Sequence, residues 1–180
     1  MAACPRCGET NAERARFCQS CSIELRADEE TPVTRRIVSV VFVDIVGSTA
    51  LGEELDPEVL RELQVRYFET VRQKVEAYGG MVEKYIGDAV VAVFGADRIH
   101  EDDALRAARA AAAIRRSIGE ANDRRGAFPA FEVRIGVNTG PVAVGDPASG
   151  HGFITGDAVN TAARLEQAAE PARSCSARPR

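Results

Sequence analysis

The sequence has no apolar run long enough to cross a membrane. Its longest near-continuous apolar stretches, Ile37 to Val43 and Ala89 to Ala96, fall far short of the roughly 20 residues that a transmembrane helix requires. The N-terminus, MAACPRCGET, also lacks the basic start and apolar core of a secretory signal. We therefore expect a protein of the reducing cytoplasm that does not enter the membrane.

The sequence also lacks an excess of positive charge. Its 23 basic and 27 acidic residues give a formal net charge of −4, so the overall charge does not favour nucleic acid or an anionic membrane surface as a partner. Lysine is scarce, because Lys74 and Lys84 are the only two and every other basic side chain is arginine. A length of 180 residues allows one domain of about 150 residues and a small appendage.

Four N-terminal cysteines form two CxxC pairs, Cys4 with Cys7 and Cys18 with Cys21, separated by ten residues. This spacing allows four thiolates to close a tetrahedron around Zn²⁺. A segment this short buries too small a core to fold alone, so the metal would supply its folding free energy. We predict a structural zinc ribbon over residues 1–25, with a protein partner as one role left open to it. Two disulfides or redox pairs are the alternative, and Cys175 is left over without a role.

The rest of the chain is expected to form one domain. Residues 26–35 are polar, include one proline and are predicted to be a linker, whereas residues 170–180 have no apolar periodicity and are predicted to be disordered. Between them, residues 36–169 carry strand and helix patterns in the order β, α, β, β, α, β.

The strands of this domain are predicted at 37–43, 81–85, 89–94 and 131–138, with a short fifth at 152–155. The first helix is predicted from Pro57, with Asp56 as its N-cap and an apolar stripe at four-residue spacing from Val59 to Val75, to the glycines at 79–80. An alanine-rich second helix starts at residues 101–103 and has Arg115 and Arg116 toward its end, and a final helix runs from Asp157, as the cap, to about Ala168. This order predicts an α+β, ferredoxin-like sheet with its first and third strands adjacent and its helices packed on one face.

Two aspartates are predicted to meet at one edge of this sheet. Asp44 ends the first strand, and Asp88 lies at the tip of the hairpin that leads into the third. Because those strands are neighbours, the carboxylates would converge as in two-metal sites, whose ions lie about 3.5–4 Å apart. Backbone N–H groups of the loop formed by Gly47, Ser48 and Thr49 would suit phosphate oxygens. Taken alone, Asp44 could equally be a capping or turn residue.

Four sequence blocks, VFVDIVGST, GGMVEKYIGDAVVAVFG, VRIGVNTGPV and TGDAVNTAARLEQA, together resemble the class III adenylate/guanylate cyclase catalytic domain. The resemblance implies a signalling enzyme that converts ATP to 3′,5′-cyclic AMP and pyrophosphate. A guanylate cyclase, or a catalytically silent module that binds nucleotide or only dimerises, are the alternatives. The acidic GG-D/E-EF turn of diguanylate cyclases and the GxxxxGK[ST] phosphate loop of Walker-type kinases are both absent.

The resemblance also implies a metal site. Asp44 and Asp88 match the family's two metal-binding aspartates, and the backbone carbonyl of Ile45 would be a further ligand. Together these groups would hold two Mg²⁺ or Mn²⁺ ions. One ion would lower the pKa of the ribose 3′-hydroxyl, and the other would bind the triphosphate and the departing pyrophosphate.

Three further residues match the family's substrate-binding positions. Lys84 matches the lysine that reads the purine, while Asn160 and Arg164 match the pair that positions the ribose and stabilises charge on the α-phosphate. Their i to i+4 spacing places the pair on one helix face. In the family these residues face the aspartates of a second subunit, so a homodimer with composite sites is implied. Lys84 and Arg164 could instead be ordinary solvated charges.

The chain departs from the family at two places. Phe153 stands where many adenylate cyclases carry an aspartate or threonine that helps to select adenine, so the choice of ATP over GTP rests on Lys84. Family domains also continue past the helix that contains Arg164, through further strands and a helix, whereas this chain ends QAAEPARSCSARPR. We expect a truncated or frameshifted gene near Glu170.

Overall fold

The computed structural model describes residues 2–12, 15, 17–23, 25, 34–124, 129–145 and 154–170. The chain divides between Val33 and Thr34 into two compact units. In the first unit, β1 (Ala2–Ala3) and β2 (Thr10–Asn11) pair antiparallel. Residues 26–33 of the predicted linker, Phe153, Cys175 and the tail from residue 171 lie outside the described residues.

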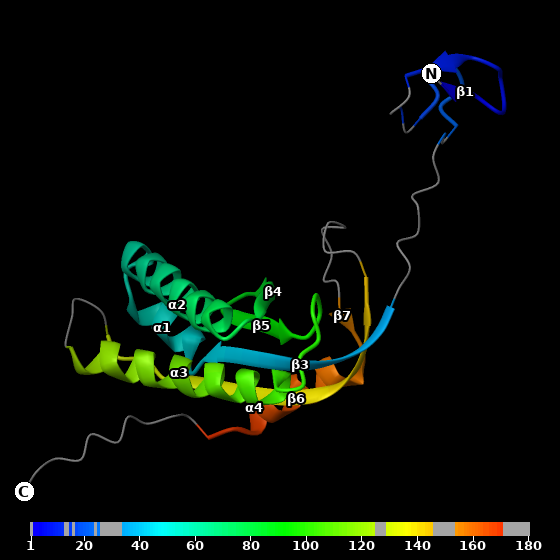
Figure 1. Ribbon diagram of the computed structural model, residues 1–180. Helices are drawn as coiled ribbons and strands as arrows, with labels where there is room; N and C mark the ends of the chain where they lie inside the picture. Colours follow the sequence, from blue (N-terminus) through cyan, green and yellow to red (C-terminus); the bar gives the residue numbers. More distant parts are fainter. Residues whose placement is uncertain are drawn as a thin grey trace, which may run out of the picture. The chain divides into compact units, whose positions relative to one another are not determined.

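A five-stranded antiparallel sheet in the order β4-β5-β3-β6-β7 is the centre of the second unit. Its strands are β3 (Thr34–Ile45), β4 (Met81–Ile86), β5 (Ala89–Phe94), β6 (Val133–Val144) and β7 (Ile154–Thr155). The central strand is β3, and it pairs with β5 on one side and β6 on the other (Figure 1). The first and third predicted strands are therefore adjacent, and the ferredoxin-like α+β fold is confirmed.

Four helices connect these strands: α1 (Ser48–Glu54), α2 (Pro57–Ala77), α3 (Asp103–Asp123) and α4 (Asp157–Ala168). Helices α2 and α3 cover one face of the sheet and α4 covers the other (Figure 1). On the first face, side chains of α2 and α3 pack with Val41 and Val43, and on the second, side chains of α4 pack with Val40 and Phe42. The prediction that all helices lie on one face was wrong for α4. The reason is that residues 38–43 of β3 are all buried, so both faces of this strand need a cover.

The predicted start of α2 is confirmed. Asp56 is the N-cap, and its side chain accepts a hydrogen bond from the Glu58 N–H at 2.9 Å, with Pro57 as the first helical residue. Leu63, Tyr67, Val71 and Val75 form a buried apolar stripe along α2, and Tyr67 donates its hydroxyl to the backbone carbonyl of Val43 at 3.0 Å. This bond ties α2 to the strand that carries Asp44.

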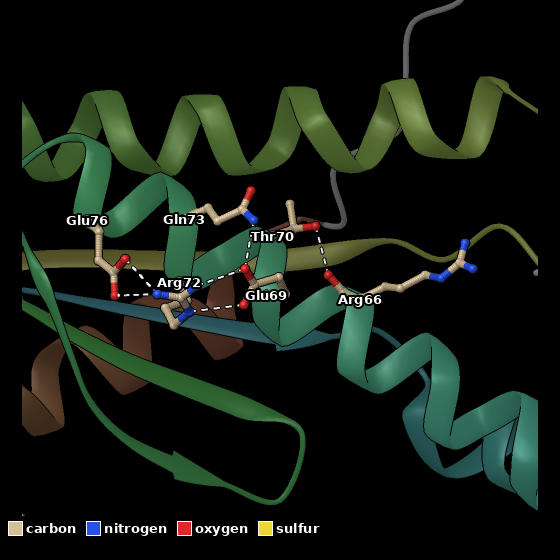
Figure 2. A network of polar contacts seen from close by, with 6 residues as sticks. All are labelled: Arg66, Glu69, Thr70, Arg72, Gln73 and Glu76. Carbon is tan, nitrogen blue, oxygen red and sulfur yellow. Dashed lines mark hydrogen bonds and ion pairs between the residues drawn. The ribbon is translucent and has the colours of Figure 1, made fainter.

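The opposite face of α2 is exposed and carries a network of charged side chains (Figure 2). Arg72 contacts both Glu69 and Glu76 at 2.7 Å, and Gln73 donates to Glu69 at 2.7 Å. Exposed ion pairs of this kind are screened by water and contribute little to stability. The buried stripe, not this network, holds α2 on the sheet.

Three local predictions need correction. Gly47 is not part of an open loop with Ser48 and Thr49. It is instead the N-cap of α1, with a left-handed φ of 68° that suits glycine. The strand predicted to end at residue 138 continues to Val144, because β3 pairs with it along its whole length. The cap of α4 is Gly156, and Asp157 is the first helical residue.

In the part of the chain that the structure describes, no helix combines the length and the apolar character needed to span a membrane.

Candidate functional site

Asp44 and Asp88 lie at the same edge of the sheet. Asp44 is near the end of β3, and Asp88 follows Gly87 in the turn before β5, where Val43 pairs with Val90. The left-handed φ of 63° at Gly87 allows this tight turn. The predicted convergence of the two carboxylates is thus built by the antiparallel pairing of β3 with β5.

The electrostatics of this edge fit a divalent cation. Burial, and next the adjacent Asp88 carboxyl, raise the pKa of Asp44 to about 6. Asp88 Oδ2 is buried and has no hydrogen-bond partner among the described residues. Paired carboxylates with an unpaired buried oxygen are the donors that Mg²⁺ and Mn²⁺ prefer. Ile45, the proposed carbonyl ligand, follows Asp44 and is buried.

Two residues of this edge were missed by the sequence analysis. Arg134 of β6 is the direct cross-strand partner of Asp44, and its Nη2 lies 3.8 Å from Asp44 Oδ2. Its Nε lies 3.2 Å from Oε1 of Glu166, a residue of α4 that is 5% exposed. Both belong to sequence blocks of the resemblance, VRIGVNTGPV and TGDAVNTAARLEQA, but neither block indicates that its charged residue turns toward Asp44.

Charge at this edge is unbalanced. Three carboxylates lie close enough to influence one another. Glu166 also raises the pKa of Asp44. Burial is the largest cause of the raised pKa of Glu166, and Asp88 raises it further. Arg134 is the one cation that the structure's ion pairs place against them among the described residues. The edge therefore carries more negative than positive charge, and a bound cation would balance this excess.

The start of α1 follows Asp44 closely along the chain. Gly47 and Thr49 are exposed and Ser48 is half-buried. The Gly47 carbonyl accepts the Leu51 N–H at 3.1 Å. The predicted phosphate-binding residues are thus the N-cap and the first two residues of the short helix that follows β3.

Lys84 lies on β4, where it pairs with Val91 of β5. Its side chain is 36% exposed, and Nζ lies 3.4 Å from Oε2 of Glu83. No ion pair or hydrogen bond joins Lys84 to Asp44 or Asp88 in the described part of the chain.

Asn160 and Arg164 are on the exposed side of α4. The buried side of this helix is formed by Ala158, Ala162 and Glu166. Arg164 is 72% exposed and its Nη2 lies 3.5 Å from Oδ1 of Asp157. Among the described residues, no hydrogen bond or ion pair joins either side chain to Asp44 or Asp88. The side chains of Asn160 and Arg164 are therefore exposed on α4 and do not contact the aspartates of their own chain in the described residues.

The four N-terminal cysteines meet in the first unit. Their sulfurs all lie within 4.8 Å of one another, with Cys4 Sγ 3.6 Å from Cys21 Sγ and Cys7 Sγ 3.6 Å from Cys18 Sγ. A Zn–S bond of about 2.3 Å gives a tetrahedron with edges of roughly 3.8 Å. The backbone N–H groups of Cys21 and Ser20 lower the pKa of the Cys18 thiol to about 6. The cluster is therefore compatible with zinc.

Residues 32–174 match the family model described as "Adenylate and Guanylate cyclase catalytic domain". The chain belongs to this family. This cyclase domain is 34% identical to an adenylate cyclase of Anabaena cylindrica over 143 residues, which are 74% of this chain and 27% of that protein. The chain spans about a quarter of the length of the curated relatives that it matches.

Solved cyclase structures share the fold. The adenylyl cyclase CyaB from P. aeruginosa superposes with a TM-score of 0.71 at 32% identity, over 78% of this chain and 76% of that one. The guanylyl cyclase Cya2 superposes with the same TM-score of 0.71 at 28% identity, over 77% of this chain and 73% of that one. The cyclase domain therefore resembles enzymes of both base specificities.

Proposed function

We propose that this cyclase domain converts ATP to 3′,5′-cyclic AMP and pyrophosphate. The observation that carries the proposal is the convergence of Asp44 and Asp88 at one sheet edge, with the pKa of Asp44 raised to about 6. Such a carboxylate pair is suited to hold cations between an attacking hydroxyl and a triphosphate. The similarity to the adenylate cyclase of Anabaena cylindrica supports this reaction class.

Asp44, Asp88 and the backbone carbonyl of Ile45 would hold two Mg²⁺ or Mn²⁺ ions. When bound, the ions would lower the pKa of the ribose 3′-hydroxyl and neutralise the triphosphate. The chain's own contribution is the buried, unpaired oxygen of Asp88 and the half-buried carboxylate of Asp44. Arg134 would hold Asp44 in place from the neighbouring strand.

We further propose that the active form is a homodimer with two composite sites. Asn160 and Arg164 lie on the exposed side of α4, and among the described residues no ion pair or hydrogen bond joins them to the aspartates of their own chain. In a second copy's site, Asn160 would position the ribose and Arg164 would stabilise the charge that grows on the α-phosphate. The first turn of α1, at Gly47, Ser48 and Thr49, would lie near the phosphates.

Lys84 would donate to an acceptor atom of the purine. An ammonium group offers three N–H donors, and both adenine and guanine carry acceptors. GTP is therefore the second candidate substrate, and the equal TM-scores of Cya2 and CyaB favour testing it.

The cysteine cluster would hold one structural Zn²⁺ and present the first unit to a protein partner. Four free thiols are typical of a reducing compartment. We accordingly propose that the protein acts in the cytoplasm, where nucleoside triphosphates are available.

Incubation of the purified chain with Mn²⁺ and either ATP or GTP tests the reaction, with cyclic product measured by chromatography. We expect product from the wild type and none from Asp44→Ala or from Arg164→Ala. An equal mixture of these two inactive variants should regain activity, because each mixed dimer holds one intact composite site. Absence of product from the wild type across a wide range of protein concentrations would contradict the proposed cyclase activity. Activity of the wild type without recovery in the mixture would contradict only the composite site.

A further inference from the structure

Strand β4 is irregular at Glu83. Val82 pairs with Ala92 and Lys84 pairs with Val91, so Glu83 is an extra residue in the ladder. Neighbouring side chains of a regular strand point to opposite faces of the sheet. A bulge redirects one of them, and here Glu83 Oε2 lies 3.4 Å from Lys84 Nζ. The irregularity brings two consecutive side chains of opposite charge together.

The carboxyl group of Glu83 is fully buried. Its side chain is 0% exposed, and neither oxygen has a hydrogen-bond partner among the described residues. A buried carboxyl group without partners is unfavourable for folding. The ion pair with Lys84 is the contact that offsets this cost, so the position is poorly explained by stability alone.

The Lys84 side chain contacts Glu83 and is also partly exposed to solvent. Its side chain is 36% exposed, and an ammonium group has three donors, of which Glu83 occupies one side. The partial exposure of the side chain leaves the other donors available to a ligand. A free lysine loses rotamer entropy when it binds, and a partner that restricts it beforehand lowers that loss.

We propose that Glu83 is a positioning residue that orients Lys84 for recognition of the purine base. The inference rests on the proposed function, since it assumes that Lys84 contacts the nucleotide. Glu83 does not touch the base, because its oxygens are buried. It acts through Lys84, and its removal should weaken nucleotide binding and leave the chemical step nearly unchanged.

A double-mutant cycle of Glu83→Gln and Lys84→Ala tests this proposal. Gln keeps the shape of Glu83 and removes its charge. We expect Glu83→Gln to raise the KM for ATP about three- to tenfold, with kcat changed by less than about twofold. In the Lys84→Ala background the same substitution should cause no further change in KM. Glu62→Gln is the matched control, because its carboxylate is exposed on α2 and pairs with Arg66.

Equilibrium binding of 3′-deoxy-ATP, which lacks the attacking hydroxyl, gives a readout that does not depend on turnover. Its Kd should rise in Glu83→Gln and be restored in part by Glu83→Asp, which keeps the negative charge and serves if the Gln variant is unstable. An unchanged Kd and KM, or an equal effect with and without Lys84, would overturn the proposal. A wild type that binds 3′-deoxy-ATP but forms no product would overturn the proposed enzyme and leave the Glu83 test intact.

Discussion

Arg134 lies directly across the β3–β6 ladder from Asp44, with Nη2 3.8 Å from Asp44 Oδ2 and Nε 3.2 Å from Glu166 Oε1. One guanidinium thus connects the proposed metal ligand with the buried side of α4. The opposite side of the same helix carries Asn160 and Arg164. The same helix therefore contacts the aspartate edge of its own chain through Glu166 and carries, on its exposed side, the two residues proposed to act in the site of a second copy.

Removing Arg134 should destabilise the protein. Arg134→Met leaves the carboxylate of Glu166, which is 5% exposed, without its positive partner. We expect the free energy of unfolding to fall by about 2 kcal/mol or more, as measured by urea denaturation. The control is Arg124→Met, because Arg124 and Glu120 form an exposed pair at 3.8 Å. An equal decrease in the free energy of unfolding in the two variants would show that the buried pair stabilises the protein no more than an exposed pair.

The raised pKa of Asp44 predicts a pH dependence of stability in buffers without added divalent cations. The ordinary pKa of an aspartate is about 3.9, whereas the folded protein raises that of Asp44 to about 6. The folded state thus binds the proton more tightly than the unfolded state, so this group's contribution is present below about pH 4 and lost as the pH rises through 6. We expect Asp44→Asn to raise the Tm at pH 7.5 and to reduce the gain in Tm between pH 7.5 and pH 5. A dependence of Tm on pH identical to that of the wild type would contradict the assignment of this effect to Asp44.

Divalent cations should stabilise the folded protein through Asp88. Mn²⁺ at about 100 times its Kd adds about 2.7 kcal/mol to the free energy of unfolding, by mass action. Thermal unfolding should therefore show a higher Tm with Mn²⁺ for the wild type and little change for Asp88→Asn, which keeps the size of the side chain. The Asp102→Asn variant serves as a control, since Asp102 is paired with Arg106 at 2.8 Å. A full Mn²⁺ response in Asp88→Asn would place the metal elsewhere.

The cysteine cluster predicts one zinc ion per chain. Cys4→Ser and Cys18→Ser each remove one of the four sulfurs that lie within 4.8 Å of one another, and a harder oxygen ligand is a poor substitute for thiolate. Metal analysis of purified protein should find about one equivalent of zinc in the wild type and far less in these variants. Cys175→Ser should retain the metal. Equal zinc content in all variants would exclude the cluster as the ligand set.

Gly136 sets how closely α4 approaches the sheet. A Cβ atom at this position would collide with the backbone of Ala162 and Glu166 on α4. Gly136→Ala should therefore move the helix, separate Glu166 from Arg134 and lower the free energy of unfolding by about 2 kcal/mol. Gly52→Ala is the control, because its Cβ would meet only Leu60 at 3.7 Å. Unaltered stability and activity of Gly136→Ala would show that α4 tolerates displacement.

Much of the fold could be predicted because its signals are local. The Asp56-Pro57 start and the apolar stripe of α2 depend on capping and on helical periodicity. The continuous apolar run before Asp44 depends on burial of both faces of β3. Once the order of strands predicts that β3 and β5 are neighbours, the meeting of Asp44 and Asp88 follows.

The sequence by itself thus determined the order of the elements, the pair of aspartates and the grouping of the four cysteines by spacing. Only the tertiary structure decided that α4 covers the second face, that Arg134 links Asp44 to Glu166, and that a bulge turns Glu83 toward Lys84. These features depend on cross-strand register and on packing between segments far apart in the chain. Neither capping preference nor apolar periodicity contains that information, because both describe a residue relative to its neighbours along the sequence.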